Sequence, residues 1–259
     1  MAADPLEREF LSDRRAFVTA SSRNLGAAIA TALAVKGATV CIQYHESADA
    51  ASRLVLELNA RTGRRHSAVR GDASSSASVS RMIADAEAAL EGAIDILVNN
   101  AGPFSMAPFT SLPEAEWDRI WDTNVKAIYV AARRVAPGMR DRGWGRIVNV
   151  SAGSAYLRNH SVYGLAKNGV NFLTEELALE LGPAVTVNAV APGQIEESAA
   201  DIGEIDPTFV ERAVRHTPAG RLVTRSEVAA IVTLMCSPAF DMVTGVTLPV
   251  DGGWRFNRF

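Results

Sequence analysis

Residues 15–44, RAFVTASSRNLGAAIATALAVKGATVCIQY, decide the fold of this chain. Residues 15–20 form a short apolar run typical of a β-strand, and residues 26–35 are strong helix formers that end at Gly37. Residues 38–44 are almost continuously apolar, as expected of a strand that is buried on both faces of a sheet. The segment therefore predicts a strand, a turn of small residues, a helix and a second strand.

The same alternation continues along the rest of the chain. We expect helices over 48–60, 76–91, 113–141, 161–181 and 225–236, and strands over 66–71, 94–99, 146–151, 184–190 and 245–250. Residues 194–224 are less regular. Alternating strands and helices without a linker or a repeat predict a single-domain, Rossmann-type, doubly wound parallel sheet in a three-layer α/β/α arrangement. Ligands of such sheets bind at the carboxyl edge, where the strand order reverses.

The composition excludes several classes of protein. A net charge of −3 over 259 residues offers no basic surface for nucleic acid. The two cysteines, Cys41 and Cys236, lie in apolar runs and indicate buried thiols in a reducing compartment rather than a disulfide framework. Residues 1–13 form a polar extension without the apolar core of a signal peptide, and no apolar stretch is long enough to cross a bilayer. We expect one domain over 14–259, located in the cytoplasm, with a small-molecule partner.

The turn between the first strand and the first helix is built of small residues. Such a turn points backbone N–H groups and a helix N-terminus outward, which suits a pyrophosphate. A tight turn without any ligand has the same composition, so this feature alone leaves both interpretations open.

A tyrosine and a lysine mark the start of the predicted helix 161–181. Tyr163 and Lys167 are four residues apart, so they lie on one face of that helix. A carbonyl that receives a hydride needs a proton donor, and a phenol with a pKa near 10 becomes a better acid–base catalyst beside an ammonium. An accidental pair on a solvated helix face is the alternative interpretation.

The order of the motifs resembles the short-chain dehydrogenase/reductase family over about residues 14–254. Residues 99–102 are the family's NNAG run, residues 163–167 match its Tyr-x-x-x-Lys motif, and a Pro-Gly pair at 192–193 and an Asp-Gly-Gly run at 251–253 follow in the family's order. Residues 19–26 are similar to the family's TGxxxGxG loop. Ala20 and Asn24 replace its first two glycines, although Asn tolerates the left-handed backbone that glycine would supply.

The resemblance implies an NADP(H)-dependent carbonyl reductase or alcohol dehydrogenase, most similar to 3-oxoacyl-thioester reductases, that assembles as a homotetramer or homodimer. It implies Tyr163 as the acid/base, Lys167 as the residue that tunes it and Asn124 as the anchor of a water in the proton relay. No metal is expected. The implied cofactor-binding residues are Thr19, Ser21, Ser22, Arg23, Asn24, Leu25, Gly26, Tyr44, His45, Asp72, Ala73, Asn100, Ala101, Gly102, Tyr163, Lys167, Pro192, Gly193 and Ile195.

The preference for NADP(H) rests on two positions. Tyr44 stands where NAD-specific relatives carry an Asp, and Arg23 matches the place from which a basic side chain meets the 2′-phosphate. A solvated Arg23, with Glu46 holding the ribose of NAD, is the alternative.

The family's catalytic serine is the least clear feature. Ala152 stands where the family usually has the second Ser of a pair, and a count back from Tyr163 falls on Val150. We predict Ser151 as the catalytic hydroxyl, with Ser154 as the second candidate.

A catalytically silenced relative that binds NADP(H) as a regulatory or structural module is the competing hypothesis. Ala20 and Ala152 favour it, whereas the retained Tyr163, Lys167 and Asn124 argue against it. Residues 196–218 are expected to form a substrate lid, and the substrate itself stays open.

Overall fold

A computed structural model describes residues 9–105, 107–156, 161–203, 206 and 208–256. Its sheet has seven strands in the order β3-β2-β1-β4-β5-β6-β7, and every pairing is parallel. The order reverses between β1 and β4, which confirms the predicted doubly wound topology. The strands are β1 (Arg15–Val18), β2 (Thr39–Tyr44), β3 (Ser67–Arg70), β4 (Ile96–Asn99), β5 (Gly145–Val150), β6 (Val185–Pro192) and β7 (Thr247–Val250).

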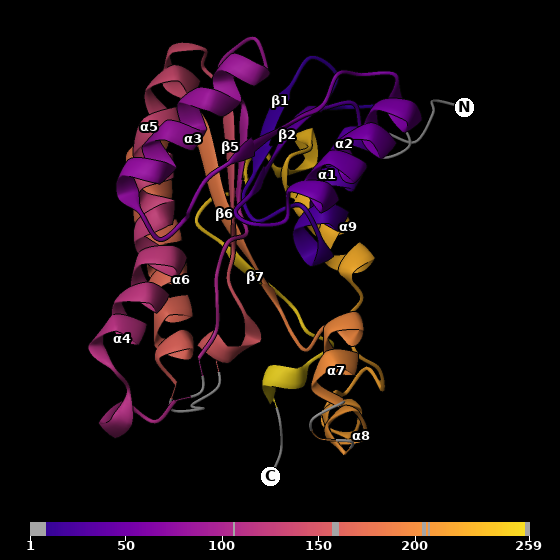
Figure 1. Cartoon of the computed structure of the whole chain (residues 1–259), viewed down its shortest axis with the longest axis vertical. Coiled ribbons are helices and arrows are strands. Elements are labelled where there is room, and N and C mark those ends of the chain that lie inside the picture. The colour runs from indigo at the N-terminus through magenta and orange to yellow at the C-terminus, as the bar shows by residue number, and fades with distance from the viewer. Residues whose placement is uncertain (1–8, 106, 157–160, 204–205, 207, 257–259) are drawn as a thin grey trace.

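Helices cover both faces of this sheet, as Figure 1 shows. One face carries α1 (Asn24–Val35), α2 (Ala48–Thr62) and α9 (Arg225–Met235). The other carries α3 (Ser76–Ala89), α4 (Glu114–Trp121), α5 (Ala127–Asp141) and α6 (Val162–Leu181). Two short helices, α7 (Glu196–Gly203) and α8 (Phe209–Arg215), lie beyond the carboxyl edge of the sheet. The prediction of a three-layer α/β/α domain is confirmed.

The apolar strands explain why both faces are covered. Successive residues of a strand point to opposite faces, so Val18 packs with α1 and α9 while Phe17 packs with α3 and α5. Both side chains are fully buried, and burial of such a side chain stabilises the fold by about 1.5–3 kcal/mol. A sheet that is apolar on both sides is stable only between two helical layers.

The predicted helix 113–141 differs most from the observed structure. It is divided into α4 and α5 by a π-helical turn, η2 (Asp122–Lys126), so the chain stays helical throughout but gains an extra residue in one turn. This turn buries Thr123 and Asn124. Such turns are common at functional sites because they rotate the residues that follow.

The N-terminal segment also departs from the expected loose extension. Leu11 is buried in the core beside α1, and its N–H donates to the carbonyl of Lys36. The fold therefore takes in at least part of residues 9–13, while residues 1–8 lie outside the described residues. Among the described helices, none combines the length and the hydropathy needed to traverse a bilayer.

Candidate active site

Two adjoining cavities open at the carboxyl edge of the sheet, beside the reversal of strand order. The outer cavity, about 580 Å³, is lined by the turn after β1, the corner after β2 and the residues that follow β3 and β4. The inner cavity, about 210 Å³, is lined by residues 150–152, Tyr163, Lys167 and the segment after β6. Leu25, Asn100 and Gly102 line both. An elongated ligand could therefore occupy the two cavities together.

The turn after β1 has the backbone of a glycine-rich loop even where glycine is missing. Ala20 has φ +48° and Asn24 has φ +54°, so both adopt the left-handed conformation that glycine adopts most easily. Gly26 is required by packing, because a Cβ there would stand 2.3 Å from the carbonyl oxygen of Ala20. The structure thus keeps this turn open to a ligand with only one of the family's three glycines.

Two of the predicted cofactor-binding residues brace this turn instead of lining the cavities. Thr19 Oγ1 accepts the N–H groups of Asn100 (2.9 Å) and Ala101 (3.0 Å). Ser21 Oγ accepts the N–H of Gln43 at 3.1 Å. Both hydroxyls are buried and lie outside the residues that line the two cavities. The other residues predicted for cofactor binding do line one or both cavities.

Gln43 is a supporting residue that the sequence did not reveal. It is buried at the end of β2, where its Oε1 accepts the N–H of Ala20 (2.6 Å) and its Nε2 donates to the carbonyl of Gly71 (2.7 Å). One amide therefore ties together the ends of β1, β2 and β3. A single polar residue near the end of an apolar strand was the available signal.

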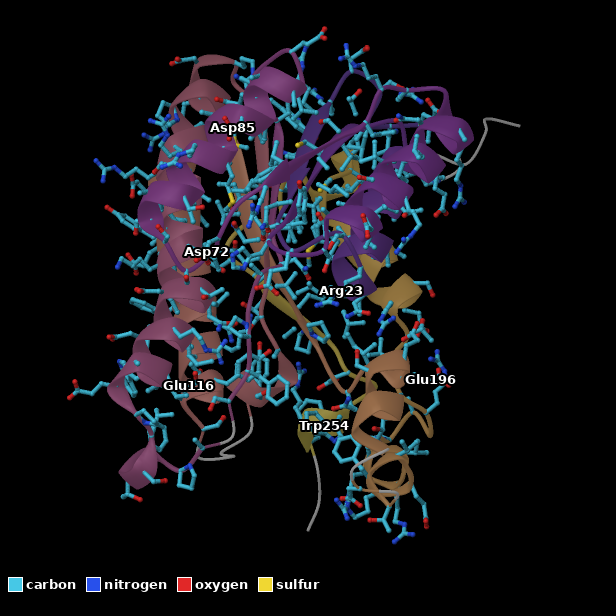
Figure 2. All side chains as sticks on the ribbon, viewed as in Figure 1. Arg23, Asp72, Asp85, Glu116, Glu196 and Trp254 are labelled. Carbon is cyan, nitrogen blue, oxygen red and sulfur yellow. The ribbon has the colours of Figure 1, made fainter. Side chains whose placement is uncertain are left out.

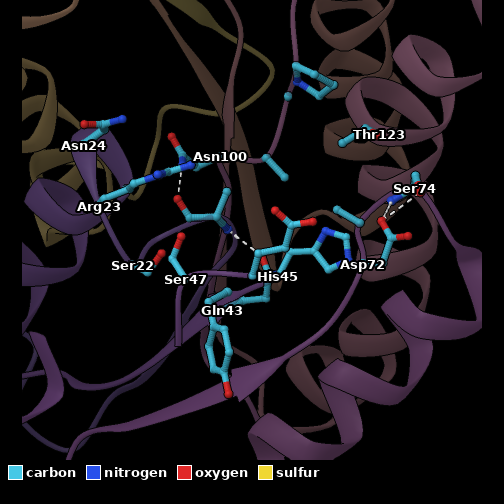
Figure 3. A pocket seen from close by; sticks show the side chains of 18 of the residues that line it. Ser22, Arg23, Asn24, Gln43, His45, Ser47, Asp72, Ser74, Asn100 and Thr123 are labelled. Carbon is cyan, nitrogen blue, oxygen red and sulfur yellow. Dashed lines mark hydrogen bonds between the residues drawn. The ribbon is translucent and has the colours of Figure 1, made fainter. Parts of the chain in front are cut away.

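The outer cavity gathers both signs of charge, as Figure 3 shows. Arg23, His45 and Glu46 line it, and within the described ranges the Arg23 guanidinium forms no ion pair. Asp72 lies on the same wall as His45. The backbone N–H and hydroxyl of Ser74 donate to its carboxylate at 2.9 and 2.7 Å, and they hold the pKa of Asp72 below its ordinary value. An unpaired guanidinium can bind a phosphate.

Ser161 fixes the start of the helix that carries the predicted acid–base pair. Its hydroxyl accepts the N–H of Gly164 at 3.1 Å, an N-cap that places Tyr163 in the first turn of α6. Lys167 follows one turn later and is buried. The cap thus fixes the position of both side chains relative to β5.

Tyr163 and Lys167 line the inner cavity, and Asn124 lies beside Lys167. Lys167 Nζ lies 5.5 Å from the centroid of the Tyr163 ring and donates to the carbonyl of Val150 at 2.7 Å. A Cβ on Gly102 would stand 2.4 Å from Asn124 Oδ1 and 3.0 Å from Lys167 Nζ, so both side chains point at the same spot. Asn124 Nδ2 donates to the carbonyls of Pro103 and Ile120, both at 3.0 Å. The π turn and the NNAG segment together create this meeting point.

Burial drives the reacting pair toward its neutral forms. It raises the pKa of Tyr163 to about 12 and lowers the pKa of Lys167 to about 7. Tyr163 is therefore protonated at neutral pH and can donate a proton. Asn124 Oδ1 is buried and has no hydrogen-bond partner among the described residues, so it offers an acceptor beside Lys167.

Ser151, the serine predicted to meet the substrate oxygen, lines the inner cavity, but its hydroxyl is hydrogen-bonded to α6. Its Oγ lies 2.6 Å from Asn171 Oδ1 and 3.3 Å from the carbonyl oxygen of Lys167, both on α6. The reason is the alternation along β5: a shift of one residue turns a side chain to the opposite face. Ala152 lines the inner cavity without a hydroxyl, and Ser154, in the short turn η3 (Gly153–Ala155), lines neither cavity.

The segment after β6 closes the inner cavity from the other side. The N–H of Gly193 donates to the carbonyl of Val250 (3.0 Å), and Ile195 forms a bridge with Val223. In Figure 2, Glu196 lies at the start of α7 and Trp254 lies in the lower part of the view, toward the end where α7 and α8 lie. Trp254 packs on the backbone of η3, where a Cβ on Gly153 would stand 3.1 Å from its ring.

The predicted lid and the exposed Phe104 line neither of the two cavities. Of the segment 196–218, α7 and α8 pack through the buried Ala199 and Ala213, while residues 204, 205 and 207 lie outside the described residues. Phe104 is 66 % exposed, and its ring centroid lies 6.4 Å from that of Tyr163. Within the described ranges, no cluster of His, Cys, Asp or Glu side chains could hold a metal ion.

Known proteins share this architecture. The family model described as "Enoyl-(Acyl carrier protein) reductase" matches residues 19–255. The D-beta-hydroxybutyrate dehydrogenase of Cupriavidus necator is 34% identical over 94% of this chain and 98% of its own length. The acetoacetyl-CoA reductase of Shinella zoogloeoides is 37% identical over 94% of this chain and 99% of its own length.

A solved structure extends the likeness to the whole fold. The gluconate 5-dehydrogenase of Burkholderia cenocepacia, solved in complex with NADP and tartrate, has a TM-score of 0.90 at 31% identity and covers 98% of this chain and 100% of its own. The ordered motifs, the doubly wound sheet, the converging Tyr163 and Lys167 and these matches lead to one conclusion: the chain belongs to the short-chain dehydrogenase/reductase family of oxidoreductases.

Proposed function

We propose that the protein is an NADP(H)-dependent carbonyl reductase or alcohol dehydrogenase. The observation that carries this proposal is the convergence of Tyr163 and Lys167 at the inner cavity, which shares walls with a cavity suited to a dinucleotide. Ligand cavities commonly measure about 300–1,000 Å³, and the outer cavity alone lies within that range.

Each residue of the reacting centre has a distinct role. A bound nicotinamide supplies the hydride or accepts it. Tyr163 donates its phenolic proton to the substrate oxygen during reduction and takes it back during oxidation. Lys167, as an ammonium, stabilises the phenolate that remains. Asn124 Oδ1 accepts a hydrogen bond from a water beside Lys167, through which a proton returns from solvent.

The preference for NADP(H) over NAD(H) follows from the charges of the outer cavity. Arg23 lines it together with Glu46, and Tyr44 stands where NAD-specific relatives carry the carboxylate that would oppose a 2′-phosphate. Planar guanidinium groups bind phosphate through two parallel hydrogen bonds. The NADP bound to the gluconate 5-dehydrogenase supports this assignment.

For the substrate we propose a small ketone of the 3-oxoacyl-thioester or polyketide-like class. The two relatives named for hydroxybutyrate and acetoacetyl-CoA support it, as does the exposed ring of Phe104 beside Tyr163. The free, buried thiols of Cys41 and Cys236 support a reducing compartment, and we infer the cytoplasm.

A spectrophotometric screen tests the function. We expect NADPH oxidation with at least one member of a panel of 3-oxoacyl thioesters, quinones, ketosteroids and keto-sugars, and slower oxidation of NADH. Tyr163→Phe should lower the rate about 10²–10⁴-fold while NADPH still binds, because only the proton donor is lost. Tyr129→Phe, at a half-exposed site on α5, is the matched control and should keep the wild-type rate.

The competing candidate is a binding module without turnover. Ala152, which lines the inner cavity at the position where the family usually has a serine, favours it. Tight NADPH binding with no turnover of any carbonyl in either direction would establish this candidate and overturn the enzymatic one.

A further inference from the structure

Both the side chain and the main chain of Lys167 are hydrogen-bonded to two consecutive residues, Val150 at the end of β5 and Ser151 directly after it. Its Nζ donates to the carbonyl of Val150 at 2.7 Å. Its own main-chain carbonyl lies 3.3 Å from the hydroxyl of the next residue, Ser151. The same hydroxyl donates to Asn171 Oδ1 at 2.6 Å, one turn further along α6. The side chain and the backbone of Lys167 are therefore fixed against the same short segment.

The topology of the sheet makes this arrangement possible. The pairing of β4 with β5 ends at Asn99 and Asn149, whereas β5 continues beside β6 to Val150. The carbonyl of Val150 thus lies one residue beyond the last pairing with β4, where Lys167 Nζ reaches it. The following residue, Ser151, turns its side chain to the opposite face and meets α6.

We propose that Ser151 and Asn171 are positioning residues that set the place of the Lys167 ammonium beside Tyr163, and that neither touches the substrate. This inference rests on the proposed function, in which Lys167 stabilises the Tyr163 phenolate. Both hydrogen-bond partners of the Ser151 hydroxyl are on α6, and the residue as a whole is only 2 % exposed. A buried hydroxyl bonded in this way has no free hydrogen for a ligand.

The surroundings of Lys167 show what the loss of this contact would change. Tyr163 is its ionisable neighbour on α6, and Asn124 and Gly102 approach it from the π turn and the NNAG segment. Burial is the cause of its lowered pKa, so a helix free to move away from β5 would admit water and raise that pKa. An ammonium displaced from Tyr163 would also stabilise the phenolate less.

Kinetic pH profiles test the inference. Ser151→Ala and Asn171→Ala should each move the basic limb of kcat/KM for alcohol oxidation upward by about one pH unit. The double variant should show the same shift as either single variant, because both remove one contact. Ser237→Ala is the matched control: its hydroxyl is also 2 % exposed and also bonds a helix carbonyl, that of Leu234 on α9, far from the cavities. It should leave the profile unchanged.

A titration of Lys167 itself does not depend on turnover. The chain has three lysines, Lys36, Lys126 and Lys167. Carbon-13 labelling of the lysine Cε positions therefore gives three NMR signals, and the signal that disappears in Lys167→Met belongs to Lys167. Ser151→Ala should raise the titration midpoint of that signal by about one unit without cofactor. If no carbonyl is reduced but this shift is seen, the proposed function fails while the positioning role stands.

Two results would overturn the inference. The first is a loss of about 10²-fold in rate at every pH in Ser151→Ala with no effect in Asn171→Ala, which would make the serine a donor to the substrate oxygen. The second is an unchanged Lys167 titration in both variants, which would show that the contact does not position the lysine.

Discussion

At the scale of the single residue, the burial of Lys167 in the candidate site lowers the free energy of unfolding. Its pKa is lowered from 10.5 to about 7 by burial. Between these two values the unfolded chain binds a proton that the folded chain does not bind. The free energy of unfolding therefore falls as the pH decreases through this window, and it rises as the pH increases. A chain selected for stability alone would place an apolar residue here.

Lys167→Met should therefore be more stable than the wild type in the absence of cofactor. We expect its advantage to be largest near pH 7 and to shrink as the pH rises toward 9, because the proton that the unfolded wild-type lysine must release on folding is removed at lower cost at higher pH. Urea denaturation at pH 7, 8 and 9 measures this difference. Lys126→Met, at an exposed lysine of η2, is the control, and an equal advantage in that variant would contradict the explanation.

The backbone of Ala20, in the turn after β1, is also strained, at a smaller cost than the burial of Lys167. Its φ of +48° places the Cβ close to the neighbouring carbonyl, at a cost of roughly 1–2 kcal/mol that glycine avoids. Glycine is more flexible in the unfolded chain, so Ala20→Gly should raise the free energy of unfolding by about 0.5–1 kcal/mol. Ala32→Gly, inside α1, should lower it by about 1 kcal/mol. Equal destabilisation by both substitutions, measured by thermal unfolding, would show that the turn is not strained.

At the scale of the element, the sequence predicted nearly every helix and strand, because their apolar periods are regular. The division of helix 113–141 was missed, since a π turn inserts one residue without changing composition. The hydrogen-bond partners of Ser151 could not be predicted either, because one residue of register at the end of β5 decides which face its hydroxyl occupies. Gln43 acts between three strand ends, and such long-range contacts leave no local pattern.

The turn after β1 and the corner after β2 should decide between the two nicotinamide cofactors. Arg23→Ala removes the guanidinium that faces the outer cavity, so we expect the Kd for NADPH to rise about 10-fold or more and the Kd for NADH to stay the same. Fluorescence titration measures both constants. Arg53→Ala, on the exposed side of α2, is the control. An equal loss of affinity for NADPH and NADH would assign Arg23 to the shared pyrophosphate instead of the 2′-phosphate.

At the scale of the whole molecule, the sheet topology gathers residues that are far apart in the sequence. Gly26 follows β1, Gly102 follows β4 and Tyr163 follows β5, yet all three reach one edge because every strand runs in the same direction. This part of the site follows from the alternation of strands and helices. The substrate does not, because we expect its specificity to depend on α7, α8 and the residues around Phe104, whose shape no sheet rule determines.

The face formed by α6 should join two copies of the chain. Leu165, Phe172 and Leu179 are spaced seven residues apart on α6, so they form one stripe, and they are 44 %, 64 % and 80 % exposed. Asn168, Glu175 and Glu176 lie between them on the same face, so the three apolar side chains form a spaced row. A two-fold axis would cover such a row with its own copy. We therefore propose a homodimer, or a homotetramer that contains this dimer.

Phe172→Glu should separate the copies, because two carboxylates would then meet at the centre of an apolar interface. Sedimentation velocity should show the wild type as a dimer or tetramer and the variant at the next smaller size. Leu56→Glu, at a 68 % exposed site on α2, adds the same charge away from the stripe and should leave the assembly intact. Two results would contradict this proposal: a wild type that sediments as a monomer, and a Phe172→Glu variant that keeps the wild-type size. In either case α6 would not join copies of the chain.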